Sequence, residues 1–177
     1  MSGSSHEFSK GDSAVVAPVP ELDSVVGRWR ARFDRSAEQG MPAHLSVLVP
    51  WIADADINDQ ALTQLADAVG RTPMEVTFRE FGELPGLLYL RPEPAAALVE
   101  MTRRIESAWP SHPHYGGAFD DVLPHLTVAV GASAAEREEI TADVRPSLPL
   151  TAKLTAIWIV VFDGARWERR ATLPLHP

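Results

Sequence analysis

Cysteine is absent from the 177-residue sequence. Its absence excludes disulfide bonds, thiolate metal sites and a cysteine nucleophile, and it is compatible with the reducing cytosol. We therefore expect a cytoplasmic protein. Long hydrophobic runs are also lacking, because no stretch reaches the roughly 18 to 20 apolar residues of a membrane helix. The longest apolar run, residues 157–162, predicts a buried strand, and we expect no membrane partner.

An excess of positive charge is lacking as well, since the formal net charge is −8 at pH 7. An acidic chain disfavours broad electrostatic binding to long nucleic acid or to an anionic membrane. A small anionic ligand held in a local site remains compatible with this charge. No obligatory protein partner is evident from the sequence.

The length of the chain favours a single domain that can bury a sizeable core. Residues 1–12 are mostly small and polar, and we expect a disordered tail there. Residues 13–177 are expected to form one domain of two lobes, about 13–86 and 87–177. An exchange of strands between the two lobes is left open.

Hydrophobic periodicity and turn residues predict helices and strands along this domain. We expect helices over about residues 22–35, 56–69, 94–109 and 133–144, the last one opened by a capping box of Ser133 and Glu136. Strands are expected over about 13–19, 44–49, 75–81, 87–91, 125–130, 151–162 and 166–173, with hairpins at 85–86 and 163–164. The first helix carries arginines on one side, and we expect them to be solvated and paired with carboxylates rather than to bind phosphate: Arg28, Arg32 and Arg35.

One short motif occurs twice in matching contexts, as HLSVLV at residues 44–49 and as HLTVAV at residues 125–130. Alternate side chains of a strand share one face. His44 and Ser46 should therefore lie on one face of their strand, and His125 and Thr127 on one face of theirs, while Leu and Val side chains, including those at 49 and 130, take the opposite faces. The order of elements around the two motifs is also similar. We expect two lobes related by an approximate two-fold axis, with both histidines and both hydroxyls in one cleft.

These four groups suit chemistry at phosphorus. In-line displacement needs a base for the entering oxygen and an acid for the leaving oxygen on the opposite side. Two imidazoles with an ordinary pKa near 6.5 can be one neutral and one protonated near neutral pH. The hydroxyls can hold non-bridging phosphate oxygens or orient water. No metal ion or other cofactor is required for such a reaction.

The paired His-x-Ser and His-x-Thr motifs, in a chain of this size, resemble the two-histidine phosphoesterase superfamily. This group includes LigT-like 2′,5′ RNA ligase proteins and cyclic nucleotide phosphodiesterases. The segment HYGGAFDDVLPHLTVAV, residues 114–130, is especially similar to the approach to the second motif in bacterial members. The architectural likeness extends over roughly residues 14–173, but the specific letters are concentrated at 44–49 and 114–130.

The resemblance implies an α+β bilobal, duplicated fold, with two mixed or antiparallel sheets and outer helices around a central cleft. It also implies metal-independent cleavage or ligation of 2′,3′-cyclic or 2′,5′-linked phosphodiesters in nucleotides or RNA ends. Carried onto this chain, the catalytic residues are His44, Ser46, His125 and Thr127. Ser46 stands where the family more often has threonine, a change that keeps the hydroxyl. For hydrolysis we assign His125 as the base and His44 as the acid, and the near symmetry leaves the reverse assignment open.

Other residues near the motifs are secondary candidates. Tyr115 precedes two glycines and could border the cleft or stack on a base, and Trp51 follows the first motif strand and could do the same from the other side. Core packing is the alternative for both. The loop histidines His112 and His114 lack a recognised metal-ligand spacing with the nearby aspartates, so we predict no metal site.

A second function remains open, that of a non-catalytic nucleotide- or RNA-binding relative that keeps the cleft without turnover. The presence of both histidines and both hydroxyls favours the enzyme, because binding alone does not demand a matched acid and base. The expected partner is a nucleotide or a short RNA.

Overall fold

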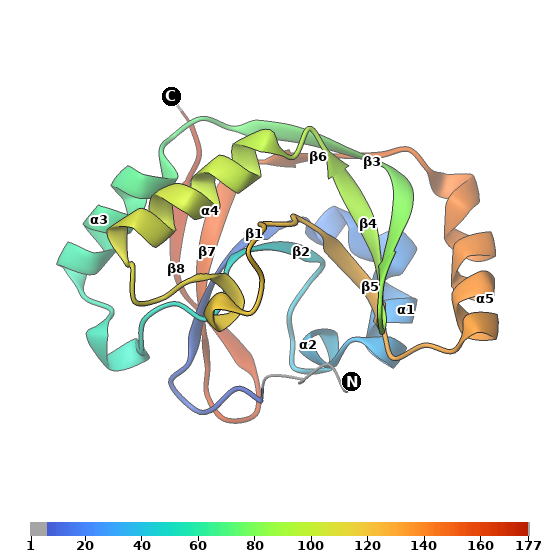
Figure 1. Ribbon diagram of the computed structural model, residues 1–177, viewed down its shortest axis with the longest axis horizontal. Coiled ribbons are helices and arrows are strands. Elements are labelled where there is room, and N and C mark those ends of the chain that lie inside the picture. The colour runs from blue at the N-terminus through green and yellow to red at the C-terminus, as the bar shows by residue number, and fades with distance from the viewer. Residues whose placement is uncertain (1–6, 177) are drawn as a thin grey trace.

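Two antiparallel four-stranded sheets form the framework of the computed structural model, which describes residues 7–176 (Figure 1). Sheet A has the order β2-β1-β7-β8 and consists of β1 (Ser13–Pro18), β2 (His44–Leu48), β7 (Ala156–Phe162) and β8 (Trp167–Pro174). Sheet B has the order β5-β4-β3-β6 and consists of β3 (Met74–Leu84), β4 (Leu87–Glu93), β5 (Leu126–Val130) and β6 (Leu150–Leu154). The predicted α+β class with two sheets is confirmed.

Helices lie outside the two sheets. The α-helices are α1 (Asp23–Phe33), α2 (Arg35–Glu38), α3 (Asp59–Val69), α4 (Ala96–Ala108) and α5 (Ala134–Val144), and the 3-10 turns are η1 (Pro20–Leu22), η2 (Asp54–Asp56), η3 (His114–Gly117) and η4 (Arg145–Ser147). In Figure 1, α3 and α4 lie at the end of the molecule with sheet A, and α1 and α5 lie at the end with sheet B. Because α1 contacts β5 and α4 contacts β2, each histidine motif packs against a helix from the other half of the chain.

Each sheet takes strands from both halves of the chain. The sequence predicted one continuous strand over residues 151–162. This prediction is wrong, because Thr155 divides the segment into β6 and β7. Leu154 pairs with Met74 in sheet B, whereas Ala156 pairs with Pro174 in sheet A. The alternation of buried and exposed side chains continues where the chain passes from sheet B to sheet A. The hydrophobic pattern of the sequence therefore does not reveal the point at which the strand changes sheets.

The two expected hairpins differ in their turns. β3 and β4 are joined at residues 85–86 as predicted. Between β7 and β8 the pairing ends at Phe162 and Trp167, so the loop has four residues and the predicted two-residue turn is wrong. The Asp163 carboxylate accepts the backbone N–H groups of Ala165 and Arg166, both at 2.7 Å, which closes the longer loop.

The predicted tail falls partly outside the described residues, since 1–6 are not described. For residues 7–12 the prediction of disorder is wrong. The Phe8 ring packs edge-to-face on Trp167 with a centroid distance of 4.8 Å, and the Gly11 N–H donates to the Phe162 carbonyl at 2.8 Å. Burial of one aromatic ring and pairing with a strand end hold this segment against sheet A.

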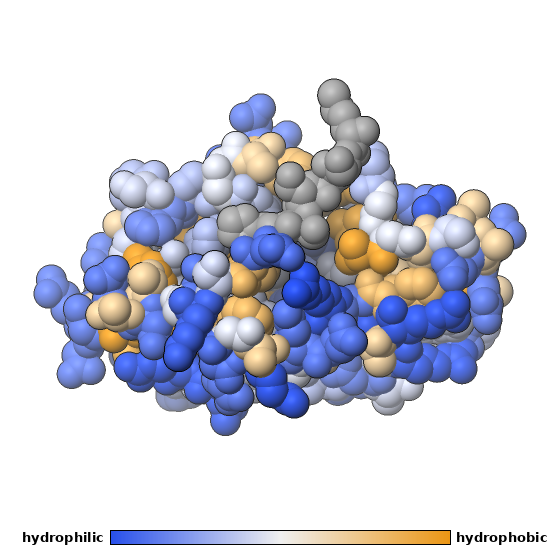
Figure 2. Space-filling view, turned by 90° about the horizontal axis from the view of Figure 1, so that it is seen from below, coloured by the Kyte–Doolittle hydropathy of each residue, from blue (hydrophilic) through white to orange (hydrophobic). Residues whose placement is uncertain are grey.

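Local signals in the helices are confirmed. Ser133 and Glu136 form the reciprocal capping box at the start of α5. Of the three arginines expected on the surface, Arg28 pairs with Asp143 and Arg32 with Glu136, as expected for charges anchored by carboxylates. Between residues 7 and 176 no helix is long and apolar enough to cross a membrane. The face seen in Figure 2 is hydrophilic over most of its area, with separate hydrophobic patches.

Both motif strands carry a bulge at the same place, just after the hydroxyl residue. On β2, Ser46 and Leu48 are opposite consecutive residues of β1, and on β5, Thr127 and Ala129 are opposite consecutive residues of β4. One extra residue in each motif strand reverses the alternation from that point. Leu48 and Ala129 are therefore buried.

The bulges also correct the expected position of two valines. Val49 and Val130, which the simple alternation placed on the buried faces, line the central cavity instead, and Val130 is 52% exposed. The first part of the prediction is confirmed: Leu45, Val47, Leu126 and Val128 are buried, while the histidines and hydroxyls are partly exposed on the other face.

Candidate active site

The two histidine motifs meet because each lies on an edge strand. β2 is the edge of sheet A and β5 is the edge of sheet B, and residues of the two strands approach to within 8 Å between Cα atoms. A cavity of about 640 Å³ opens at this seam. Its lining includes all four predicted catalytic residues, namely His44, Ser46, His125 and Thr127. The structure thus brings the two motifs together at one site.

The two imidazoles are held in the same way. Nδ1 of His44 donates to the Pro42 carbonyl at 2.8 Å, and Nδ1 of His125 donates to the Leu123 carbonyl at 2.8 Å. A carbonyl oxygen only accepts, so each Nδ1 must carry the proton. Each Nε2 is therefore the nitrogen left to exchange a proton with a ligand in the cavity.

The protein around the imidazoles favours their neutral form. Burial lowers the pKa of His44, the hydrogen bond to Pro42 opposes this, and the positive charges of Arg30 and His125 lower it further against the opposing charge of Asp34. Burial also lowers the pKa of His125, again opposed by its carbonyl partner. Both groups therefore titrate below the ordinary histidine value of 6.5.

Tyr115 is placed at the site, as one of the two secondary candidates. Its ring stacks on His125 with a centroid distance of 6.3 Å and an interplanar angle of 24°. A hydrogen bond joins its hydroxyl to Ser46, and its pKa is raised by burial of the phenol against the opposing effect of that bond. Its backbone N–H donates to the Val49 carbonyl. The residue is still 38% exposed, which leaves a surface that a ligand in the cavity could contact.

Trp51 is not brought to the cavity. Its side chain is 3% exposed and packs edge-to-face on Trp109 with a centroid distance of 5.2 Å. The indole therefore packs against the end of α4 and does not line the cavity. Trp51 is close to the first motif in the sequence, but this does not determine whether its ring faces the cavity or the core.

One of the loop histidines, His114, holds the segment that carries Tyr115. The His114 ring is bonded through Nδ1 to the Glu106 carboxylate, and its Nε2 donates to the Asp121 carbonyl at 3.2 Å. Burial acts to raise the pKa of Glu106, but the hydrogen bonds from His114 outweigh it and lower the value. Over the described range, 7–176, no group of three or more acidic or histidine side chains is arranged to hold a metal ion.

Tyr89 is a site neighbour that the sequence analysis missed. Its ring meets His125 edge-to-face at a centroid distance of 5.5 Å, and it lies beside Thr127 in the pairing of β4 with β5. The opposite neighbour on β3 is Gly82, where an added Cβ would lie 2.3 Å from the Tyr89 ring. A glycine opposite an aromatic residue in the predicted hairpin was the available signal.

A second group of cavity-lining residues was not placed at the site by the sequence analysis. The N-terminal segment, the end of α1, α2 and the connection from α2 to β2 contribute Phe8, Phe33, Asp34, Arg35 and Met41. Arg35 pairs with Glu7 only at 3.8 Å, between two largely exposed side chains. Most of these residues precede the first motif closely in the chain, since α2 comes directly before β2, but no spacing rule connects them with His125 in the second motif.

Comparison with solved structures finds the same fold in LigT of E. coli. The complex with 3′-AMP matches with a TM-score of 0.63 and 16% identity over 95% of this chain and 99% of that chain. The complex with NADP⁺ matches with a TM-score of 0.61 and 15% identity over 96% of this chain and 100% of that chain. The protein TT0787 of Thermus thermophilus matches with a TM-score of 0.60 and 15% identity over 93% and 97% of the two chains. Likeness at this level of identity concerns the fold alone.

Comparison with sequences adds the family. Among curated proteins there is no significant match. The model of the 2′-5′ RNA ligase superfamily matches residues 18–166, which include both motifs and the loop that carries Tyr115. The match extends over most of the chain, and the chain belongs to the 2′-5′ RNA ligase superfamily of two-histidine phosphoesterases.

Proposed function

We propose that this chain is a metal-independent phosphodiesterase that acts on 2′,3′-cyclic or 2′,5′-linked nucleotides or RNA ends. One observation carries the proposal: two histidines present Nε2 to one cavity, while each Nδ1 is occupied by a main-chain carbonyl. This arrangement supplies one proton acceptor and one proton donor to a single ligand. A cavity built only for binding would not need a matched pair.

The reaction assigned to the site is hydrolysis of a cyclic phosphodiester. Nε2 of His125 takes a proton from water as the water oxygen attacks phosphorus. The bond from phosphorus to the 2′ or 3′ ribose oxygen breaks, and protonated His44 gives its Nε2 proton to that oxygen. The product is a ribose phosphate monoester, and proton exchange with solvent restores both imidazoles. Ligation has the same proton balance, with a ribose hydroxyl of a second nucleotide in the place of water: His125 takes the proton of that hydroxyl as it attacks phosphorus, the bond to the 2′ or 3′ ribose oxygen breaks, and His44 protonates that oxygen.

The hydroxyls of Ser46 and Thr127 serve the phosphate in this proposal. Each lies two residues after its histidine on the same face of its strand, so each can donate a hydrogen bond to a non-bridging oxygen. The hydroxyl of Tyr115 adjoins Ser46 and can share that task. Charge on the phosphate is thus met by neutral donors and one imidazolium, with no cofactor.

The dimensions and charge of the molecule support a small substrate. A cavity of about 640 Å³ is within the usual range for small-molecule sites. The net charge of −8 disfavours long RNA. The LigT complexes with 3′-AMP and NADP⁺ are nucleotide complexes of a protein with the same fold, which supports a nucleotide or a short RNA end here.

Turnover in the presence of a chelator tests the proposal. We expect the protein to hydrolyse 2′,3′-cyclic nucleotides or 2′,5′-linked dinucleotides in EDTA, measured by separation of the monoester or nucleoside products. Equal rates with and without added Mg²⁺ are expected, because proton transfer and neutral donors carry the reaction. Binding of these nucleotides without turnover would instead favour the non-catalytic relative. Activity that appears only with a divalent metal ion would contradict the mechanism.

The pH optimum of catalysis should lie on the acid side of the ordinary histidine pKa. Catalysis needs one imidazole protonated and the other neutral, a state that is most populated between the two pKa values, and both are lowered from 6.5. We expect kcat/KM for a 2′,3′-cyclic nucleotide to follow a bell with its optimum below about pH 6.5, with limbs that belong to the pair. The kcat optimum should lie at higher pH, because a bound phosphate anion favours imidazolium. An optimum of kcat/KM well above pH 7 would contradict this expectation.

A further inference from the structure

The two motifs differ in the residue that precedes histidine, which is Ala43 in the first and Pro124 in the second. In both motifs the histidine Nδ1 donates to the carbonyl two residues earlier, that of Pro42 or of Leu123. This carbonyl belongs to the peptide bond that joins Pro42 to Ala43 in the first motif and Leu123 to Pro124 in the second. The peptide bond at Ala43 also has an N–H group. The peptide bond at Pro124 has none, because proline lacks it.

Asp23 uses that N–H group. The Ala43 N–H donates to Oδ2 of Asp23 at 2.9 Å, while the carbonyl of the same peptide accepts from His44 at 2.8 Å. A trans peptide is planar and directs its N–H and C=O groups to opposite sides. The carboxylate and the imidazole are therefore connected through one rigid peptide unit.

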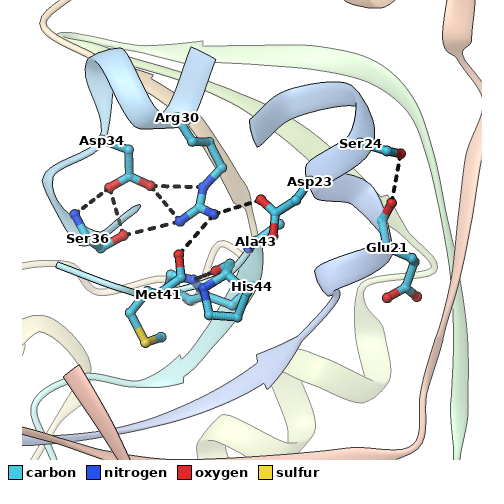
Figure 3. A network of polar contacts seen from close by, with 10 residues as sticks. Glu21, Asp23, Ser24, Arg30, Asp34, Ser36, Met41, Ala43 and His44 are labelled. Carbon is cyan, nitrogen blue, oxygen red and sulfur yellow. Dashed lines mark hydrogen bonds and ion pairs between the residues drawn. The ribbon is translucent and has the colours of Figure 1, made fainter. Parts of the chain in front are cut away.

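Arg30 holds the other oxygen of Asp23 and the neighbouring carbonyl. Its Nη1 donates to Oδ1 of Asp23 at 3.1 Å and to the Met41 carbonyl at 3.2 Å (Figure 3). Its Nε donates to Asp34 at 3.1 Å, and the Arg30 side chain is only 2% exposed. The guanidinium therefore holds the segment around the Pro42 carbonyl in two ways: directly at the Met41 carbonyl, and through Asp23 at the Ala43 N–H.

The position of Asp23 on α1 leaves space for this contact. Gly27 lies one turn further along the helix, and an added Cβ there would lie 3.3 Å from the Cβ of Asp23. Glycine inside a helix is less favourable than alanine by about 1 kcal/mol. A glycine at this position is consistent with a requirement to keep the Asp23 side chain uncrowded.

We infer that Asp23 is a positioning residue for His44, acting through the Pro42–Ala43 peptide and held in place by Arg30. The carboxylate orients the peptide plane and polarises it, so the carbonyl becomes a stronger acceptor for Nδ1–H. The ring of His44 is thereby fixed in the tautomer that presents Nε2 to the cavity. The proline before His125 rules out the same connection there, and the His125 ring is instead flanked by the rings of Tyr89 and Tyr115.

The variant Asp23→Asn tests the inference directly. Arg30 and Ala43 donate to different oxygens of Asp23, and asparagine replaces one of these oxygens by an NH2 group that cannot accept. We expect kcat on a 2′,3′-cyclic nucleotide to fall about 10-fold or more, because a small displacement of a proton-transfer group is costly. KM should change far less, since the peptide does not touch the substrate.

Asp143→Asn is the matched control. Asp143 also accepts with both oxygens from side chains of α1, those of Arg28 and Trp29. Its side chain is 37% exposed, against 33% for Asp23. It lies outside the cavity lining and on a different helix from the residues that hold the segment before His44, so kcat should remain at the wild-type value. An equal loss in both variants, or wild-type kcat in a folded Asp23→Asn protein, would overturn the inference.

A second measurement is independent of turnover, and only the kinetic test above rests on the proposed function. In ¹⁵N NMR of the histidine side chains, the wild-type protein should show His44 mainly in the Nδ1–H tautomer when neutral. Asp23→Asn should lose part of that preference at His44 and leave His125 unchanged. If the spectra of the two proteins agree at His44, Asp23 does not position the ring, whether or not the protein is an enzyme.

Discussion

Replacing either motif histidine by alanine, in His44→Ala or His125→Ala, is expected to lower kcat/KM at least about 100-fold, the usual loss when a general acid or base is removed. The double variant should lose little more than the single ones, because an acid and a base that act on one phosphorus work as a unit. The measurement is the initial rate on a 2′,3′-cyclic nucleotide in EDTA near the acid optimum, with folding checked by circular dichroism.

His112→Ala is the matched control for the histidine variants. His112 lies in the loop before Tyr115 and does not line the cavity. Its replacement removes an imidazole without altering either proton-transfer group. We therefore expect kcat/KM to stay within about 3-fold of wild type, far from the roughly 100-fold loss expected for the motif variants. Full activity in either motif variant would contradict the two-histidine mechanism.

Arg30→Met is expected to lower the free energy of unfolding by about 3–5 kcal/mol, as found when one partner of a buried ion pair is removed. The guanidinium holds Asp34, Asp23 and the Met41 carbonyl from a position that is almost fully inaccessible to water. Methionine fills much of the volume but leaves the buried Asp34 carboxylate without its cation. Urea unfolding followed by tryptophan fluorescence measures the loss.

Arg32→Met provides the comparison on the same helix. Arg32 pairs with Glu136 on the surface, and exposed pairs contribute about 0–1 kcal/mol. Adding Asp34→Asn to Arg30→Met should recover part of the stability, since the unpaired charge is then removed as well. If Arg30→Met costs no more than Arg32→Met, the buried network does not stabilise the segment before His44.

The part of the site that the sequence predicted rests on local periodicity. The two copies of the motif place histidine and hydroxyl on one face of each strand, and His44, Ser46, His125 and Thr127 do line one cavity. Tyr115 also reaches the cavity as expected. The catalytic roles of these residues stay predictions until the variants are measured.

Other features depend on pairing between distant segments, and no spacing in the sequence reveals them. The bulges after Ser46 and Thr127 exist only relative to the register of β1 and β4. The contact of Tyr89 with His125 needs the hairpin of β3 and β4 to lie beside β5. Trp51, which lies close to the first motif in the chain, packs instead on a tryptophan at the end of α4.

By itself, the sequence determined which side chains each motif strand presents, because alternation along a strand is a local property of the backbone. It also determined that only the first motif offers a peptide N–H, because Pro124 precedes His125. The tertiary structure alone decided that the two strands meet as sheet edges, and that Asp23 and Arg30 reach the Pro42–Ala43 peptide. These contacts join separate helices and strands, and their geometry depends on how the whole core packs.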